Sequence, residues 1–296
     1  METVHDMKEI LGEDFFKEEV RCDYLVTAEM KQVWAVLIDM YLAFVSVCEK
    51  YGLRYYVIWG ALLGAVRHNG FIPWDDDFDV GMPREDYNKL FDVARGDFSY
   101  PLFLQSPYTD PGYFLSYNKL RNSTTTAMPY VTNHRRFNQG IPFDIFPMDD
   151  CDTNTMVIER EEIYKRVKRL GVAMRYGNPL LGERQLQDQI TYWTDNPMRE
   201  YEEMERIASS HHNTKDYYVA VLTTGDVRKK VWPKRLFEST VKHKFESIEI
   251  EIPSNYDELL TIQYGDYMKF PEPEQRGVKH DLLLWDPNKP YAEFLI

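Results

Sequence analysis

The distribution of apolar residues predicts alternating helices and strands early in the chain. Between residues 27 and 51, apolar side chains recur at intervals of three and four, which is the spacing of one helix face. Residues 55–59 are aromatic and β-branched and predict a short buried strand that ends at Gly60. Residues 61–67 are mostly small or apolar and predict a second helix, which Gly70 ends because glycine accepts a positive φ.

Two segments in which acidic and apolar residues alternate predict further strands. Residues 75–82 alternate in this way, and the acids of common parity are Asp75, Asp77 and Asp79. Pro83 ends this strand, and residues 84–95 predict a helix that packs on the sheet. Residues 141–146 alternate around Asp144 and predict another strand, so the first 150 residues predict a mixed α+β or α/β core.

The pattern changes after Cys151. Residues 159–176 and 184–210 predict charged amphipathic helices separated near residues 177–179. Residues 217–223 and 241–252 predict strands, and Ser254 with Asp257 predicts a capping box for a helix that continues to about Tyr264. We therefore divide the chain into an N-terminal helical segment (1–52), an α+β core (53–150) and a mainly helical extension packed on that core (151–296).

Charge and composition narrow the possible partners. The 35 Lys and Arg residues against 48 Asp and Glu residues give a net charge of −13. An acidic surface opposes contact with a nucleic-acid backbone, so we expect no nucleic-acid partner. An excess of carboxylates suits divalent cations instead, although most of them are expected to be solvated surface groups.

Cysteine usage and the apolar stretches predict a cytoplasmic protein. The three cysteines are odd in number and form no CxxC motif, so neither a disulfide framework nor a zinc knuckle is predicted. The first residues lack the pattern of a secretory signal. Residues 33–48 form the longest apolar stretch, which Asp39 interrupts and which we expect to be too short to span a membrane. Attachment to the inner membrane surface stays compatible with this pattern.

The chemistry is concentrated in residues 59–82, WGALLGAVRHNGFIPWDDDFDVGM. On a strand, Asp77 and Asp79 would project from the same face with Cα atoms about 6.6 Å apart, close enough for both carboxylates to bind one hard cation. Like charges at this distance are costly unless a cation neutralises them. Asp75 either joins this site or caps the preceding turn.

Alternative interpretations of these acids are a solvated strand edge and a calcium loop. In an EF-hand loop the glycine would fall on Val80 and the bidentate glutamate on Asp86, so that pattern fails. The chain contains no GxGxxG, GxxxxGK[ST], GxSxG or HExxH motif.

The segment LLGAVRHNGFIPWDDDFDVGM closely resembles the signature of the LicD family, which includes bacterial phosphocholine transferases and is related to fukutin-related protein. Residues 119–122 (KLRN), 140–149 (GIPFDIFPMD) and 264–268 (YGDYM) match as well, as do the later Pro271, Arg276 and His280. The resemblance extends from about Leu53 to His280. It implies an α+β nucleotidyltransferase-like fold with a mixed sheet and added helices.

The resemblance also implies an activity. It is the transfer of phosphocholine, or a similar phospho-alcohol, from a CDP-linked donor such as CDP-choline to a sugar hydroxyl of a cell-surface glycan, with release of CMP. Such glycans include teichoic acid and lipopolysaccharide, and contact with membrane-bound glycan precursors would be peripheral. Divalent Mg²⁺ or Mn²⁺ would bridge carboxylates and donor phosphates. The implied metal ligands are Asp75, Asp77, Asp79 and Asp144, of which Asp77, Asp79 and Asp144 are the implied catalytic residues, with Asp144 also able to accept the proton of the sugar hydroxyl.

Four further residues are implied to hold the donor phosphates. Gly60 would let the backbone approach them at a helix start, and Arg67, Lys119 and Arg121 would clamp them. The competing interpretations are a helix-packing glycine and surface salt bridges. Arg276 and His280 match the family without a derivable role, and no spacing among the 6 Trp, 21 Tyr and 16 Phe residues identifies a choline cage.

Two alternatives to phospho-alcohol transfer stay open. The same acids could activate attack on the α-phosphate of a nucleoside triphosphate with release of pyrophosphate. The chain could also be a metal-binding relative without catalytic activity.

Overall fold

The longest helix, α2 (Ala28–Tyr51), forms the centre of the hydrophobic core. Thr27 caps its start by accepting a hydrogen bond from the Met30 amide at 3.1 Å, and Gly52 ends it with φ 61°. With 24 residues the helix is long and apolar enough to cross a membrane, so the expectation that this apolar segment is too short to do so was wrong. However, 67% of its apolar window is buried inside the fold, so packing in the core accounts for its composition.

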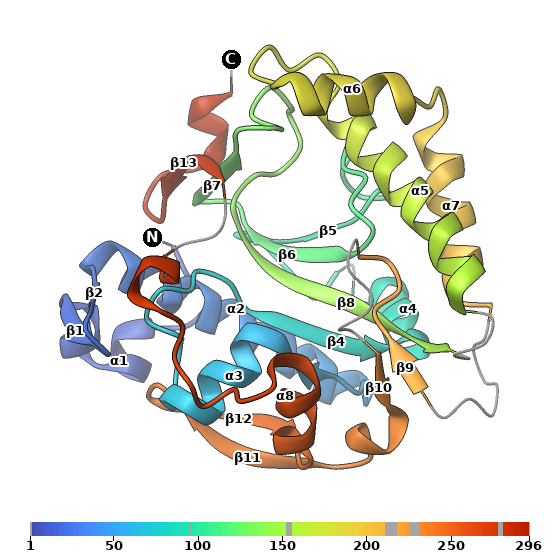
Figure 1. Cartoon of the computed structure of the whole chain (residues 1–296). Helices are drawn as coiled ribbons and strands as arrows, with labels where there is room; N and C mark the ends of the chain where they lie inside the picture. Colours follow the sequence, from blue (N-terminus) through green and yellow to red (C-terminus); the bar gives the residue numbers. More distant parts are fainter. Residues whose placement is uncertain are drawn as a thin grey trace.

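A computed structural model describes residues 2–94, 96–151, 156–210, 218–224, 231–277 and 281–295 (Figure 1). Its central sheet has the order β10-β9-β8-β4-β3, with β6 and β5 added beside β8. The strands are β3 (Tyr56–Val57), β4 (Asp79–Pro83), β5 (Leu102–Gln105), β6 (Asn118–Asn122), β8 (Ile141–Cys151), β9 (Tyr218–Ala220) and β10 (Val231–Pro233). Strands β4 and β8 run parallel, whereas the other pairings recorded in this sheet are antiparallel. The predicted α+β fold with a mixed sheet is confirmed.

Aromatic packing fixes which face of the sheet meets α2. Phe78 and Phe143 stack with ring centroids 5.6 Å apart, and Tyr41 and Phe44 of α2 contact these two rings. The amide of Asp144 donates to the Phe78 carbonyl at 3.2 Å, which aligns the two chains at this level. Because successive residues of a strand point to opposite faces, Asp79 and Asp144 project away from α2.

Helices and hairpins surround this sheet (Figure 1). The remaining helices are α1 (Met7–Leu11), α3 (Trp59–His68), α4 (Arg84–Val93), α5 (Met156–Arg175), α6 (Glu183–Thr191), α7 (Pro197–Ala208) and α8 (Tyr256–Tyr264). The 3-10 helices are η1 (Glu13–Phe16), η2 (Lys234–Phe237), η3 (Pro273–Gln275) and η4 (Tyr291–Phe294). Within the described residues, three strand pairs lie outside the central sheet: β1 (Glu19–Arg21) with β2 (Tyr24–Val26), β11 (Thr240–Phe245) with β12 (Ile248–Pro253), and β7 (Thr126–Pro129) with β13 (Leu282–Asp286). In Figure 1, α5, α6 and α7 form a group apart from α3 and α8.

Several predicted boundaries were wrong. The strand predicted over residues 75–82 begins only at Asp79, because the Asp75 amide bonds to the Ile72 carbonyl at 2.9 Å and forms a turn. The helix predicted over 61–67 already begins at Trp59 and ends at His68, and the following Asn69 takes the left-handed conformation (φ 54°) expected of Gly70. Gly70 is required for another reason, since a Cβ there would overlap the Glu246 side chain.

Two predicted helices in the second half of the chain also differ from the structure. The helix predicted over 184–210 is interrupted, because Asn196 caps the Arg199 amide and Pro197 starts α7. Ser254 does not cap α8, which follows Asn255 without a side-chain cap.

The predicted segment boundary at 150/151 falls within β8, and β9 and β10 add to the central sheet. Helices therefore dominate residues 156–208, whereas later residues complete the core. Residue 217, the first of the predicted strand over 217–223, lies outside the described residues.

Candidate active site

A row of charged side chains crosses the sheet on the face opposite α2. Asp79 of β4 pairs with Asp144 of β8, and Asp144 pairs with Lys119 of β6. The Lys119 ammonium donates to both oxygens of Asp144, at 2.7 and 2.9 Å. The two-residue period of each strand decides which face its charged side chain points to, and the register between the strands brings the three side chains side by side.

Two further carboxylates approach this row from the loop before β4. Asp75 and Asp77 do not lie on the strand itself, so the spacing expected for a strand does not apply to them. The Asp75 carbonyl accepts a hydrogen bond from the Trp34 indole at 2.9 Å, which anchors the loop to α2. A Cβ built on Gly60 would lie 2.7 Å from Asp75 Oδ2 and 3.7 Å from Asp77 Oδ1, so the first turn of α3 directly adjoins both carboxylates.

Burial and mutual repulsion perturb this cluster. Asp79 is only 8% exposed, and its pKa is raised first by burial and then by the charges of Asp77, Asp144 and Asp75, while Lys119 acts in the opposite direction. Burial lowers the pKa of Lys119, and Asp144 partly offsets that effect. Acidic oxygens that disfavour one another's ionisation are characteristic of a site that receives positive charge.

The donor set suits a hard divalent cation, because carboxylate oxygens are the ligands that Mg²⁺ and Mn²⁺ prefer. Within the described part of the chain, no three His, Cys, Asp or Glu side chains are arranged as a ready metal site. The fit of this site to a divalent cation therefore rests on the chemistry of the four aspartates and on the repulsion between their charges at Asp79, which a bound cation would relieve.

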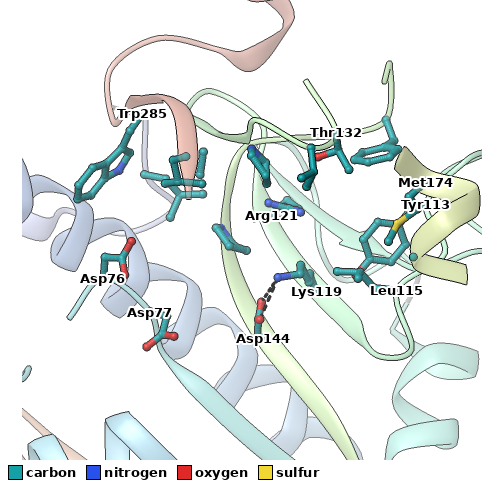
Figure 2. Close-up of a pocket in the computed structure, with 18 of the residues that line it drawn as sticks. Asp76, Asp77, Tyr113, Leu115, Lys119, Arg121, Thr132, Asp144, Met174 and Trp285 are labelled. Atoms are coloured by element: carbon teal, nitrogen blue, oxygen red, sulfur yellow. Dashed lines mark hydrogen bonds and ion pairs between the residues drawn. The ribbon is translucent and has the colours of Figure 1, made fainter. Parts of the chain in front are cut away.

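Two cavities adjoin the acids. The wide cavity, of about 600 Å³, is lined by Gly60, Asp75, Asp77 and Asp79 together with residues from 264–275. The narrow cavity, of about 300 Å³, is lined by Asp76, Asp77, Lys119 and Asp144 together with residues from β7, α5 and β13. Figure 2 shows Asp77 and the Lys119–Asp144 pair at one end of the narrow cavity, with Trp285 and Thr132 toward the other.

The three basic residues predicted to clamp phosphate lie in different places. Lys119 and Arg121 line the narrow cavity, and the Arg121 guanidinium donates to Gln105 Oε1 at 2.8 Å and to the Gly140 carbonyl at 2.6 Å. Burial lowers the pKa of Arg121. Arg67 lines the wide cavity, where it donates to the Tyr267 carbonyl at 2.8 Å and stacks on Phe270. Arg67 thus holds residues 267–270 against α3.

The structure assigns a packing role to one family residue and adds several lining residues. Arg276 donates to the Pro271 and Cys22 carbonyls and stacks on Trp74 at 5.1 Å, so it fastens the wall of the wide cavity. His280 lies outside the described residues. Trp285 and Tyr113 in the narrow cavity and Lys269 in the wide cavity had no signal in the sequence, because these residues join the site only through tertiary packing.

Comparison with known proteins agrees with the motif resemblance. Residues 52–181 match the family model described as LicD/FKTN/FKRP, nucleotidyltransferase domain. The chain is 26% identical to the lipopolysaccharide cholinephosphotransferase LicD of Haemophilus influenzae over 266 residues, which cover 80% of this chain and 90% of that protein. Over 42 residues it is 52% identical to human ribitol 5-phosphate transferase FKRP, covering 14% of this chain and 8% of that protein. An uncharacterised protein of Rickettsia prowazekii is 35% identical over 101 residues, 34% of each chain. The predicted family resemblance is confirmed, and the two relatives with named activities are transferases.

Proposed function

We propose that this protein transfers a phospho-alcohol, phosphocholine first among them, from a CDP-linked donor to a sugar hydroxyl of a cell-surface glycan, because residues 52–181 match the family model described as LicD/FKTN/FKRP, nucleotidyltransferase domain. The observation that carries the proposal is the row of Asp79, Asp144 and Lys119 across β4, β8 and β6, next to Asp75 and Asp77. The Haemophilus relative, which aligns over 80% of the chain, supports phosphocholine as the group transferred.

In the proposed reaction, the oxygen of the acceptor hydroxyl forms a bond to the phosphorus that carries the alcohol. The bond between that phosphorus and the oxygen of CMP breaks, and its electron pair leaves with CMP. The hydroxyl proton passes to the carboxylate of Asp144, which Lys119 holds in place through two hydrogen bonds. Attack and departure lie roughly in line, so the protein's main task is to position the two substrates.

Asp75, Asp77, Asp79 and Asp144 are the residues that would hold Mg²⁺ or Mn²⁺. The cation would supply charge neutralisation for the donor diphosphate and for the departing CMP. Gly60 lets the Asp75 carboxylate lie against the first turn of α3, because a Cβ at this position would lie only 2.7 Å from Asp75 Oδ2. The odd number of cysteines and the lack of a CxxC motif support placing the reaction in the cytoplasm, where nucleotide-activated donors are made.

The test is a donor screen with matched variants. CDP-choline, CDP-ethanolamine, CDP-glycerol and CDP-ribitol are incubated with the protein and Mg²⁺ or Mn²⁺, and release of CMP is measured. We expect Asp79→Asn to lower CMP release at least 100-fold without loss of unfolding free energy. Asp92→Asn is the control, because Asp92 is an exposed acid that lines neither cavity.

Three results would contradict the proposal. Asp79→Asn could retain near-wild-type CMP release at saturating Mg²⁺. Pyrophosphate released from CTP or ATP would favour nucleotidyl transfer instead. Calorimetry that detects the metal but no nucleotide would favour a metal-binding protein without catalysis.

A further inference from the structure

The two cavities divide the acidic cluster between them. Asp75 and Asp79 line the wide cavity, Asp144 lines the narrow cavity, and Asp77 lines both. Asp77 therefore stands at the junction of two spaces that differ in size and lining. One space is about 600 Å³ and the other about 300 Å³.

We propose that the wide cavity binds the nucleotide of the donor and that the narrow cavity binds the acceptor sugar. This assignment rests on the proposed function and adds to it the position of each substrate. In phosphoryl transfer the attacking and departing oxygens stand on opposite sides of phosphorus. A phosphorus held beside Asp77 meets that requirement when the two substrates enter from the two cavities.

The lining of the wide cavity suits a nucleoside diphosphate. Three carboxylates, Asp75, Asp77 and Asp79, face it and can share a cation with phosphate oxygens. Lys269 is exposed on its rim and offers a point charge to a phosphate. Phe270 and Trp74 supply aromatic surface, although Arg67 and Arg276 already stack on these rings. That occupancy disfavours a quaternary ammonium on the same ring faces, because cations repel one another.

The lining of the narrow cavity suits a sugar ring. Trp285, Tyr113 and Phe137 offer aromatic faces of the kind on which the C–H face of a sugar packs. The Lys119–Asp144 pair forms a polar end where a hydroxyl can both donate and accept a hydrogen bond. Figure 2 shows Trp285 on β13, on the side of Asp76 and away from Tyr113.

Trp285 lies outside the matched segment of residues 52–181, as does Leu282. Both come from β13, which pairs with β7 and completes the narrow cavity. Acceptor selection is thus assigned to a strand that the family match does not include, whereas the acids lie within that match. Trp285 is a positioning residue for the acceptor in this scheme.

The first experiment measures nucleotide binding in two matched variants. CMP and CDP-choline are titrated with Mg²⁺ into the wild type, Lys269→Ala and Trp285→Ala by calorimetry. We expect Lys269→Ala to weaken CMP binding at least fivefold and Trp285→Ala to change it less than twofold. Weaker CMP binding in Trp285→Ala than in Lys269→Ala, or equal affinity in all three proteins, would overturn the assignment. A wild type that binds neither nucleotide would instead refute the proposed function.

The second experiment measures transfer to a panel of methyl hexosides with CDP-choline as donor. We expect Trp285→Ala to raise the acceptor KM at least fivefold with the donor KM unchanged, and Trp285→Phe to restore most of the difference. A rise in the donor KM alone would reverse the assignment of the two cavities. Transfer to water but to none of the hexosides would refute a sugar in the narrow cavity while leaving the donor chemistry intact.

Discussion

Replacing Gly60 by alanine separates the needs of folding from the needs of catalysis. The added Cβ would lie 2.7 Å from Asp75 Oδ2, whereas ordinary contact begins at 3.4 Å, so the carboxylate must move by about 0.7 Å. Asp75 is partly exposed, and its carboxylate is the mobile end of a side chain, so this movement costs little. Alanine gains at most about 1 kcal/mol over glycine in a helix. We therefore expect Gly60→Ala to change the unfolding free energy by less than about 1 kcal/mol.

The same displacement falls on Asp75, a carboxylate of the proposed metal site. A misplacement near 1 Å costs about 100-fold in rate, equivalent to about 2.7 kcal/mol of barrier. Gly64→Ala is the matched control in the same helix, because its Cβ would lie 2.5 Å from the Gly70 carbonyl, a backbone atom that cannot rotate away. We expect Gly64→Ala to lose about 1–3 kcal/mol of stability.

Urea denaturation and CMP release measure the two effects, and calorimetry with Mn²⁺ reports on the carboxylates independently of turnover. The expected result is a folded Gly60→Ala protein with weakened metal binding and roughly 100-fold slower CMP release. The reasoning is refuted if Gly60→Ala binds Mn²⁺ and turns over as the wild type does. It is also refuted if Gly60→Ala loses as much stability as Gly64→Ala.

Three further predictions concern a buried ion pair, a histidine and the site lysine. Arg84 is 3% exposed and donates hydrogen bonds of 2.6 and 2.9 Å to Asp149, whose charge raises the pKa of Arg84 above its ordinary value despite burial. We expect Arg84→Met to lower the unfolding free energy by about 3–5 kcal/mol in urea denaturation, because it leaves the Asp149 charge buried without its partner. The double variant Arg84→Met with Asp149→Leu should lose less. Burial, followed by the charge of Arg67, lowers the pKa of His68 to about 4, so the unfolded state binds more protons between pH 4 and 6.5 and stability rises with pH across that window. His68→Phe should flatten this dependence in denaturation at pH 4.5 to 7, and an unchanged slope would contradict it. Lys119→Met should slow CMP release at least 100-fold. It should also increase the stabilisation of the protein by Mg²⁺, because Asp144 loses the ammonium that bonds to it. Thermal shift measured at equal Mg²⁺ in both proteins shows whether the stabilisation rises or falls.

Much of the core followed from local pattern. The face of α2 was predictable because its residues repeat with the helical period, and the strand around Asp144 was predictable because acidic and apolar residues alternate in it. Asp144 also points away from α2 for this reason, since its neighbour Phe143 packs against that helix. Periodicity predicts which side chains share a face of a helix or strand, and the face on which Asp144 lies determines which neighbours it can contact.

The start of β4 shows where periodicity fails. Residues 75–78 have strand-like parity, but a tertiary hydrogen bond from Trp34 and a turn at Asp75 hold them in a loop. Arg84 carried no signal, because its partners Asp149 and Glu205 come from distant segments. The two cavities were equally unpredictable, since the wide cavity combines residues from 60–79 with residues from 264–275, and the narrow cavity combines residues from 113–144 with Leu282 and Trp285.

The parallel pairing of β4 with β8 has a consequence for how the protein reaches its active form. Asp79 and Asp144 are register partners although 144 − 79 = 65 residues separate them in sequence. Contacts between distant segments form slowly, because the chain must first close a long loop. The backbone hydrogen bonds of α2 join residues close in sequence, whereas the acids meet only after β8 has docked beside β4. We therefore expect the proposed cation binding to appear during refolding only after the helical signal, when the pairing of β4 with β8 is complete.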